Sequence, residues 1–194
     1  MKTPKDVVLI KVNQKEKQER KIVGTDITLK VLTHFNEYHE DHCVHSGIVV
    51  VCPDKISGGG EVEIKEGDKI YTHHFLTHEE NKADDLLPET YRMTYDEIYC
   101  KIVDGEIEML SHWNFLEPVE EESKTASGLI VTAKPKKIEG LAIMRKPSKY
   151  MQSIGIEDGT KLLFKKNAGY VILVEGKKYY RVIDEHIFGI YEQE

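Results

Sequence analysis

The sequence predicts an all-β protein made of two small β-barrels in tandem, each with a long loop after its first strand. Three observations lead to this prediction: short β-branched runs bounded by turn residues, little helical periodicity, and a set of motifs that occurs twice. The chain has 194 residues, of which 40% are hydrophobic and 31% charged, and its net charge is −7. This length and composition fit a soluble protein of one large or two small domains.

The first half contains five short runs that are typical of strands. Pro4 precedes the run VVLIKV, and Gly47 precedes a second run that stops at Cys52 and Pro53. Glycine and proline at such positions mark the limits of strands. The expected strands are residues 7–12, 48–51, 69–71, 91–94 and 98–103. Residues 27–42 are the best helical candidate, although their apolar positions fit a helix only loosely.

The second half repeats this pattern of short runs and turns. Glu175 and Gly176 separate two β-rich runs, which suits a tight hairpin. One strand is expected to close at Phe115 and Leu116, and the others are residues 141–144, 161–164, 170–174 and 178–183.

Internal repetition supports the division into two barrels. The segment YRMTYDEIY at 91–99 resembles YRVIDEHIF at 180–188. The other matched segments are 67–71 with 158–162, 47–50 with 140–143, and 4–10 with 110–116. The expected domains are therefore residues 1–104 and 105–194.

The long loop of the second half carries an unusual apolar triplet. Leu129, Ile130 and Val131 lie within residues 120–140, a run rich in Lys, Glu, Ser and Thr. Such a run buries too little apolar surface to offset the entropy lost on ordering. The triplet is therefore either the tip of a buried strand or a contact for a partner, and we favour the partner.

Residues 105–194 resemble the co-chaperonin (GroES-type) family. The strand at 110–116 and the loop at 117–139 look like the family's first strand and mobile loop, with Gly128 leading into the apolar triplet. Residues 1–104 resemble the family in outline only, as a divergent barrel in which Ile22 and Val23 could form a second loop contact. Residues 53–60 and 145–154 are shorter than the family's roof hairpin.

The resemblance implies a function without bond chemistry. It implies a homo-oligomer, in the form of a ring, that caps a GroEL-type chaperonin and assists ATP-dependent protein folding. The chaperonin's apical domains would bind Gly128, Leu129, Ile130 and Val131, and no cofactor is expected. The alternative is a structural or adaptor β-protein, of viral origin for example, that has the same barrel and does not dock on a chaperonin.

Other constellations carry less weight. His39, His42, Cys43 and His45 crowd one segment and could present zinc ligands, but no CxxC accompanies them, so a solvated or interface loop is favoured and no metal is predicted. The interspersed charges argue against nucleic acid as a partner, and no apolar run approaches the roughly 20 residues of a membrane helix. We expect a cytoplasmic protein, in the host cytoplasm if it is viral, and not an enzyme.

Overall fold

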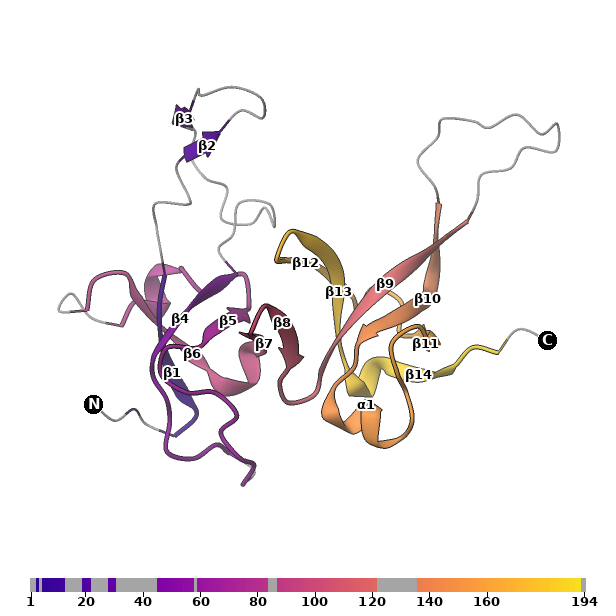
Figure 1. Cartoon of the computed structure of the whole chain (residues 1–194), viewed down its shortest axis with the longest axis horizontal. Helices are drawn as coiled ribbons and strands as arrows, with labels where there is room; N and C mark the ends of the chain where they lie inside the picture. Colours follow the sequence, from indigo (N-terminus) through magenta and orange to yellow (C-terminus); the bar gives the residue numbers. More distant parts are fainter. Residues whose placement is uncertain are drawn as a thin grey trace. The chain divides into compact units, whose positions relative to one another are not determined.

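The computed structural model describes residues 3, 5–12, 19–21, 28–30, 45–57, 59–83, 87–121 and 136–192 (Figure 1). The chain divides into two compact units, Met1–Glu108 and Met109–Glu194. No helix in the described part is long and apolar enough to cross a membrane. The two described cysteines, Cys52 and Cys100, are free thiols.

The first unit is built on a six-stranded antiparallel sheet in the order β6-β1-β4-β5-β7-β8. Its strands are β1 (Val7–Lys11), β4 (Ser46–Val51), β5 (Lys69–Thr72), β6 (Thr90–Thr94), β7 (Ile98–Val103) and β8 (Glu106–Met109). Two short strands, β2 (Glu19–Lys21) and β3 (Thr28–Lys30), form a separate hairpin, and the 3₁₀ turns are η3 (Glu79–Asn81) and η4 (Tyr95–Glu97).

The second unit is built on a six-stranded sheet in the order β12-β13-β9-β10-β11-β14. Its strands are β9 (Trp113–Glu121), β10 (Lys136–Lys146), β11 (Lys161–Phe164), β12 (Tyr170–Val174), β13 (Lys177–Ile183) and β14 (Ile187–Ile190). A short helix α1 (Lys149–Ser153) follows β10, and a 3₁₀ turn η5 (Asp184–His186) joins β13 to β14.

Five strands have the same order in both units. The series β6-β1-β4-β5-β7 in the first unit corresponds to β13-β9-β10-β11-β14 in the second. Val7 pairs with Thr94 as Trp113 pairs with Ile183, which matches the repeat read from residues 4–10 and 110–116. The prediction of an all-β fold built from two similar small units in tandem is confirmed.

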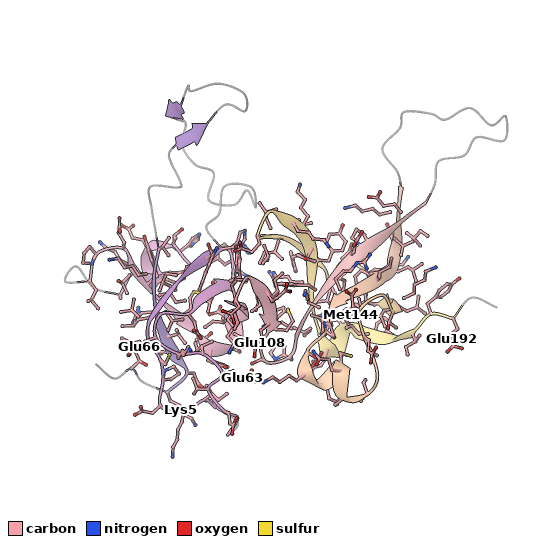
Figure 2. All side chains as sticks on the ribbon, viewed as in Figure 1. Lys5, Glu63, Glu66, Glu108, Met144 and Glu192 are labelled. Atoms are coloured by element: carbon pink, nitrogen blue, oxygen red, sulfur yellow. The ribbon has the colours of Figure 1, made fainter. Side chains whose placement is uncertain are left out.

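The core of the second unit follows from the alternation of side chains along its strands. Leu116, Met144 and Val182 are fully buried in one apolar cluster with Leu162 and Met151. Met144, labelled in Figure 2, comes from the middle of the sheet order, on β10. Full burial of each such side chain stabilises the fold by roughly 1.5–3 kcal/mol.

The structure corrects one local expectation and adds one helix that was not predicted. Within 27–42, the helical candidate, Thr28–Lys30 form strand β3, while the rest lies outside the described residues. Residues 145–154 contain a helix, Lys149–Ser153, because the Ser148 hydroxyl accepts the Met151 N–H at 3.1 Å and caps its first turn. The hairpin at Glu175 and Gly176 is confirmed, with φ of 47° and 78°.

Candidate binding site

The strands β9 and β10 form an arm that leads to residues 122–135 (Figure 1). On the arm, Glu120 pairs with Lys137, and the next regular pair is Pro118 with Ala142. Gly140 lies in the irregularity between these pairs, with φ of +78°, and a Cβ there would come within 3.1 Å of the Phe164 carbonyl oxygen. A glycine is needed at this bulge. The bulge separates the strand pairs of the arm from those within the barrel.

The arm is also attached through side chains. Lys137 Nζ donates a hydrogen bond to Tyr180 Oη at 2.7 Å and lies 4.9 Å from the centroid of that ring. Tyr180, on β13, packs against the apolar core. These contacts connect the base of the arm to the sheet.

A charged group stabilises β10 further toward the barrel. Arg145 Nε donates to Glu117 Oε2 at 2.6 Å, and Arg145 Nη1 donates to Asp158 Oδ1 at 3.3 Å. The hydrogen bond with Glu117 is the main reason that the pKa of Arg145 is raised. All three side chains are partly exposed, so the group contributes only about 1 kcal/mol.

The predicted contact residues lie outside the described residues. Gly128, Leu129, Ile130 and Val131 belong to 122–135, and the structure describes only the arm from which this segment leaves and to which it returns. Ile22 and Val23 also lie outside the described residues, between β2 and β3.

The second unit also has a pocket of about 740 Å³, beside β14 and α1. Its apolar lining is Tyr150, Met151, Ile154, Ile156, Ile183, Ile187 and Phe188. Tyr150 is 57% exposed and Phe188 70% exposed, so large apolar side chains border the opening. Sequence reasoning missed this pocket, because its walls come from residues 150–156 and 183–189, which are far apart in the sequence and are brought together only by the fold.

A largely buried polar network adjoins this pocket, and its Asp184 also lines the pocket. Asn114 Nδ2 donates to Asp184 Oδ1 at 2.7 Å, and Asn114 Oδ1 accepts the Ser148 N–H at 2.7 Å. The Ser148 hydroxyl donates to the same Asp184 oxygen at 2.7 Å. The network therefore joins β9, the start of α1 and the start of η5. A polar residue between Trp113 and Phe115 in a strand was the signal that could have revealed it.

The histidine-rich segment is only partly described. His39, His42 and Cys43 lie outside the described residues, whereas His45 lies just before β4, with its ring centroid 6.5 Å from that of His74. Among the residues that the structure describes, no group of three or more His, Cys, Asp or Glu side chains is placed to hold a metal.

Comparison with known proteins agrees with this architecture. The family model described as "Chaperonin 10 Kd subunit" matches residues 106–191. Co-chaperonin GroES of Rhodothermus marinus is 35% identical over 94 residues, which are 45% of this chain and 94% of that relative. Co-chaperonin GroES of Geotalea uraniireducens (strain Rf4) is 34% identical over 82 residues, which are 39% of this chain and 85% of that relative. The chain belongs to the co-chaperonin family.

Proposed function

We propose that this protein is a co-chaperonin that caps a GroEL-type chaperonin and assists ATP-dependent protein folding. The observation that carries the proposal is the arm of β9 and β10, in a unit that matches the chaperonin 10 family over 106–191. The arm presents residues 122–135, and this segment contains the only three-residue apolar run between Glu121 and Lys136.

The contact with the chaperonin would be made by Gly128, Leu129, Ile130 and Val131. Burial of each of the three apolar side chains contributes roughly 1.5–3 kcal/mol. Ordering a polar segment around them costs several kcal/mol, so a single loop binds weakly. Several loops on one oligomer raise the total affinity through effective concentration, while each contact still dissociates easily.

The edges of the sheets favour assembly of several copies. In the first unit, β7 is covered on its outer side by β8. Its equivalent in the second unit, β14, pairs with β11 and stands at the edge of the described sheet, with Phe188 and Ile190 exposed. Exposed strand edges are sites for pairing with another chain. We propose that a second copy covers β14 and that such contacts close a ring.

The first unit would serve as a divergent barrel of the same ring-forming chain. We propose the domains as residues 1–104 and 105–194, although the compact units divide four residues later, after Glu108. Because β9 extends to Glu121 and β10 begins at Lys136, the expected loop of 117–139 is shortened, and we propose 122–135 as the docking loop. Ile22 and Val23 are proposed as a weaker second contact, because they lie between two paired strands, β2 and β3, as the triplet lies between β9 and β10.

Capture by a chaperonin tests this function. The full chain is mixed with a GroEL-type chaperonin with and without ADP or ATP, and native mass spectrometry reports both the oligomer and the complex. We expect a nucleotide-dependent complex that Ile130→Ser abolishes while the oligomer stays intact.

Leu173→Ser is the matched control, because Leu173 is an aliphatic side chain in the same unit that is 51% exposed and lies on β12, away from the arm. It should leave the complex unchanged. Failure of the unmodified chain to bind in any nucleotide state would overturn the proposal in favour of a structural or adaptor β-protein. An unfolded Ile130→Ser variant would show that the triplet belongs to a core strand.

A further inference from the structure

The direction of the arm formed by β9 and β10 is not fixed by strand pairing alone. Between the pair of Glu120 with Lys137 and the next regular pair, β10 has residues 138–141, whereas β9 has only Val119. An irregularity of this kind bends a strand and interrupts its ladder of hydrogen bonds. Contacts outside the ladder are therefore needed to hold the arm at one angle to the barrel.

One such contact joins the arm to β13, on the far side of β9. Lys137 Nζ donates a hydrogen bond to Tyr180 Oη at 2.7 Å and lies 4.9 Å from the centroid of the same ring. The ammonium group therefore contacts both the hydroxyl and the π-system of one side chain. Tyr180 is a firm anchor, because it pairs with Leu116 on one side and Val171 on the other and packs against the core.

A second contact joins the arm to the end of β11, on the other side of β10. Lys166, which follows β11, has its Nζ 3.2 Å from Glu139 Oε2. Gly140 approaches the same place closely, because a Cβ there would lie 3.1 Å from the Phe164 carbonyl oxygen and 3.6 Å from Lys166 Cγ. Residues 137–140 are thus held from both sides of the sheet.

The effect of these contacts is geometric, since each is weak. The side chains of Glu139 and Lys166 are 76% and 68% exposed, and exposed ion pairs change the stability of a fold little. Lys137 is also exposed. Two contacts on opposite sides of one strand nevertheless restrict its swing, although neither adds much to the stability of the barrel.

We propose that two pairs, Lys137 with Tyr180 and Glu139 with Lys166, hold the arm at one angle to the barrel. These four are positioning residues for docking through residues 122–135. An arm that is already held in its binding direction loses less conformational entropy on docking. In an oligomer this gain applies to every arm that engages, so it raises the effective concentration of the remaining arms. The docking role rests on the proposed function, whereas the angle of the arm is measured without a chaperonin.

Distances within the free protein test the arm directly. Spin labels are attached to p-acetylphenylalanine at Lys136, the outer end of β10, and at Glu157, an exposed residue of the barrel, and labelled chains are diluted with unlabelled ones. Double electron–electron resonance should give one narrow distance distribution for the otherwise unmodified chain. Tyr180→Phe keeps the ring and removes the hydroxyl, whereas Lys166→Glu places a like charge beside Glu139. Each change should broaden the distribution.

Docking on a GroEL-type chaperonin with ADP or ATP is measured with the same variants without labels. Loss of one contact should weaken each arm by about threefold, and an oligomer that engages two arms by about tenfold, while native mass spectrometry shows an intact oligomer. Exchanging the charges, Glu139→Lys with Lys166→Glu, should restore both the narrow distribution and the affinity. Lys165→Glu is the matched control, because it makes the same change of charge at the neighbouring exposed lysine, and it should alter neither result.

The two measurements separate the angle of the arm from its role in docking. Distributions that are equally narrow in the unmodified chain, Tyr180→Phe and Lys166→Glu would overturn the positioning of the arm. Broader distributions with unchanged affinity would overturn its role in docking. If the unmodified chain binds no chaperonin in any nucleotide state, the proposed function fails together with the docking role, and the distances still decide whether the contacts hold the arm.

Discussion

The two units share a strand order but close their barrels with different chemistry. In the second unit, Asn114, Ser148 and Asp184 form a buried polar network between β9, α1 and η5. In the first unit, the strand pairing places the fully buried Val8 where the second unit has Asn114. Tyr95, at the start of η4, takes the place of Asp184, and its hydroxyl oxygen accepts the Glu63 N–H at 2.8 Å.

This comparison distinguishes features that both units share, and that the fold requires, from features found in one unit alone. Both units use the same turn, in which the Gly67 N–H donates to Val49 O and the Gly159 N–H donates to Met144 O, each at 2.9 Å. The polar network is particular to the second unit, where it also holds the helix that lines the pocket. A barrel with this strand order therefore accepts either an apolar side chain or a polar network at this position, provided that every buried polar atom is paired.

The largest effect is expected from Asn114→Leu. This change leaves the Ser148 N–H and the Asp184 carboxylate without their shared partner, and we expect the second unit to lose about 3 kcal/mol of unfolding free energy. Trp113, the single tryptophan of the chain, adjoins Asn114 and reports unfolding of this unit by fluorescence in a urea titration. Val8→Leu, at the equivalent position, exchanges one apolar side chain for another and should cost only about 1 kcal/mol in the first unit. Equal losses in the two variants would show that the network adds nothing beyond packing.

An intermediate effect is expected where the units differ by one methyl group. Gly47 pairs with Ile70 as Ala142 pairs with Leu162, so the two residues are equivalent. A Cβ on Gly47 would lie 2.4 Å from Ile10 Cγ2 and 2.8 Å from the Lys11 carbonyl oxygen. We therefore expect Gly47→Ala to destabilise the first unit by about 2 kcal/mol.

Amide exchange of Val49, which donates to the Asp68 carbonyl oxygen at 2.9 Å, measures this loss. The reciprocal variant, Ala142→Gly, should cost the second unit about 1 kcal/mol, from backbone entropy and a lost methyl contact. A neutral Gly47→Ala would mean that β1 and β4 can separate freely at this point.

The smallest effect is expected at alkaline pH. Burial raises the pKa of Tyr95 above its ordinary value of about 10. Because the folded state holds this proton more tightly than the unfolded state, the stability it contributes is present below about pH 10 and is lost as the pH rises further. Tyr95→Phe should reduce the difference between the urea midpoints at pH 9 and pH 11, measured by circular dichroism. The second unit has Asp184 in place of Tyr95, so its unfolding, followed by Trp113 fluorescence, should be the same in the unmodified protein and in the variant. If Tyr95→Phe leaves the difference between the urea midpoints at pH 9 and pH 11 unchanged, Tyr95 is not the source of the alkaline loss of stability.

Much of the fold could be predicted because its signals are local. The segments 91–99 and 180–188 each form a strand, a 3₁₀ turn and a strand, in the register that their sequences indicate. The match of Gly47 with Gly140 was wrong by two residues, since pairing makes Gly47 equivalent to Ala142. The two glycines are needed for different reasons: Gly140 adopts a positive φ at a bulge, whereas Gly47 leaves room for Ile10.

The candidate site was predictable to a different degree. The apolar triplet stands out within a polar run, yet it lies outside the described residues and stays a prediction. The network could not be predicted, because Asn114 is 34 residues from Ser148 and 70 residues from Asp184. Only the folded sheet brings these side chains within hydrogen-bonding distance.

The bulge at Gly140 has a mechanical consequence. Residues 122–135 join the outer ends of two antiparallel neighbours, so tension on this segment peels β9 from β10 one pair at a time instead of shearing all pairs together. The pairs of Glu121 with Lys136 and Glu120 with Lys137 take the load first, and the regular pairing of the barrel resumes only at Ala142, so those two pairs separate before the barrel is loaded. The arm can thus yield under a pull on its tip while the sheet behind it stays closed.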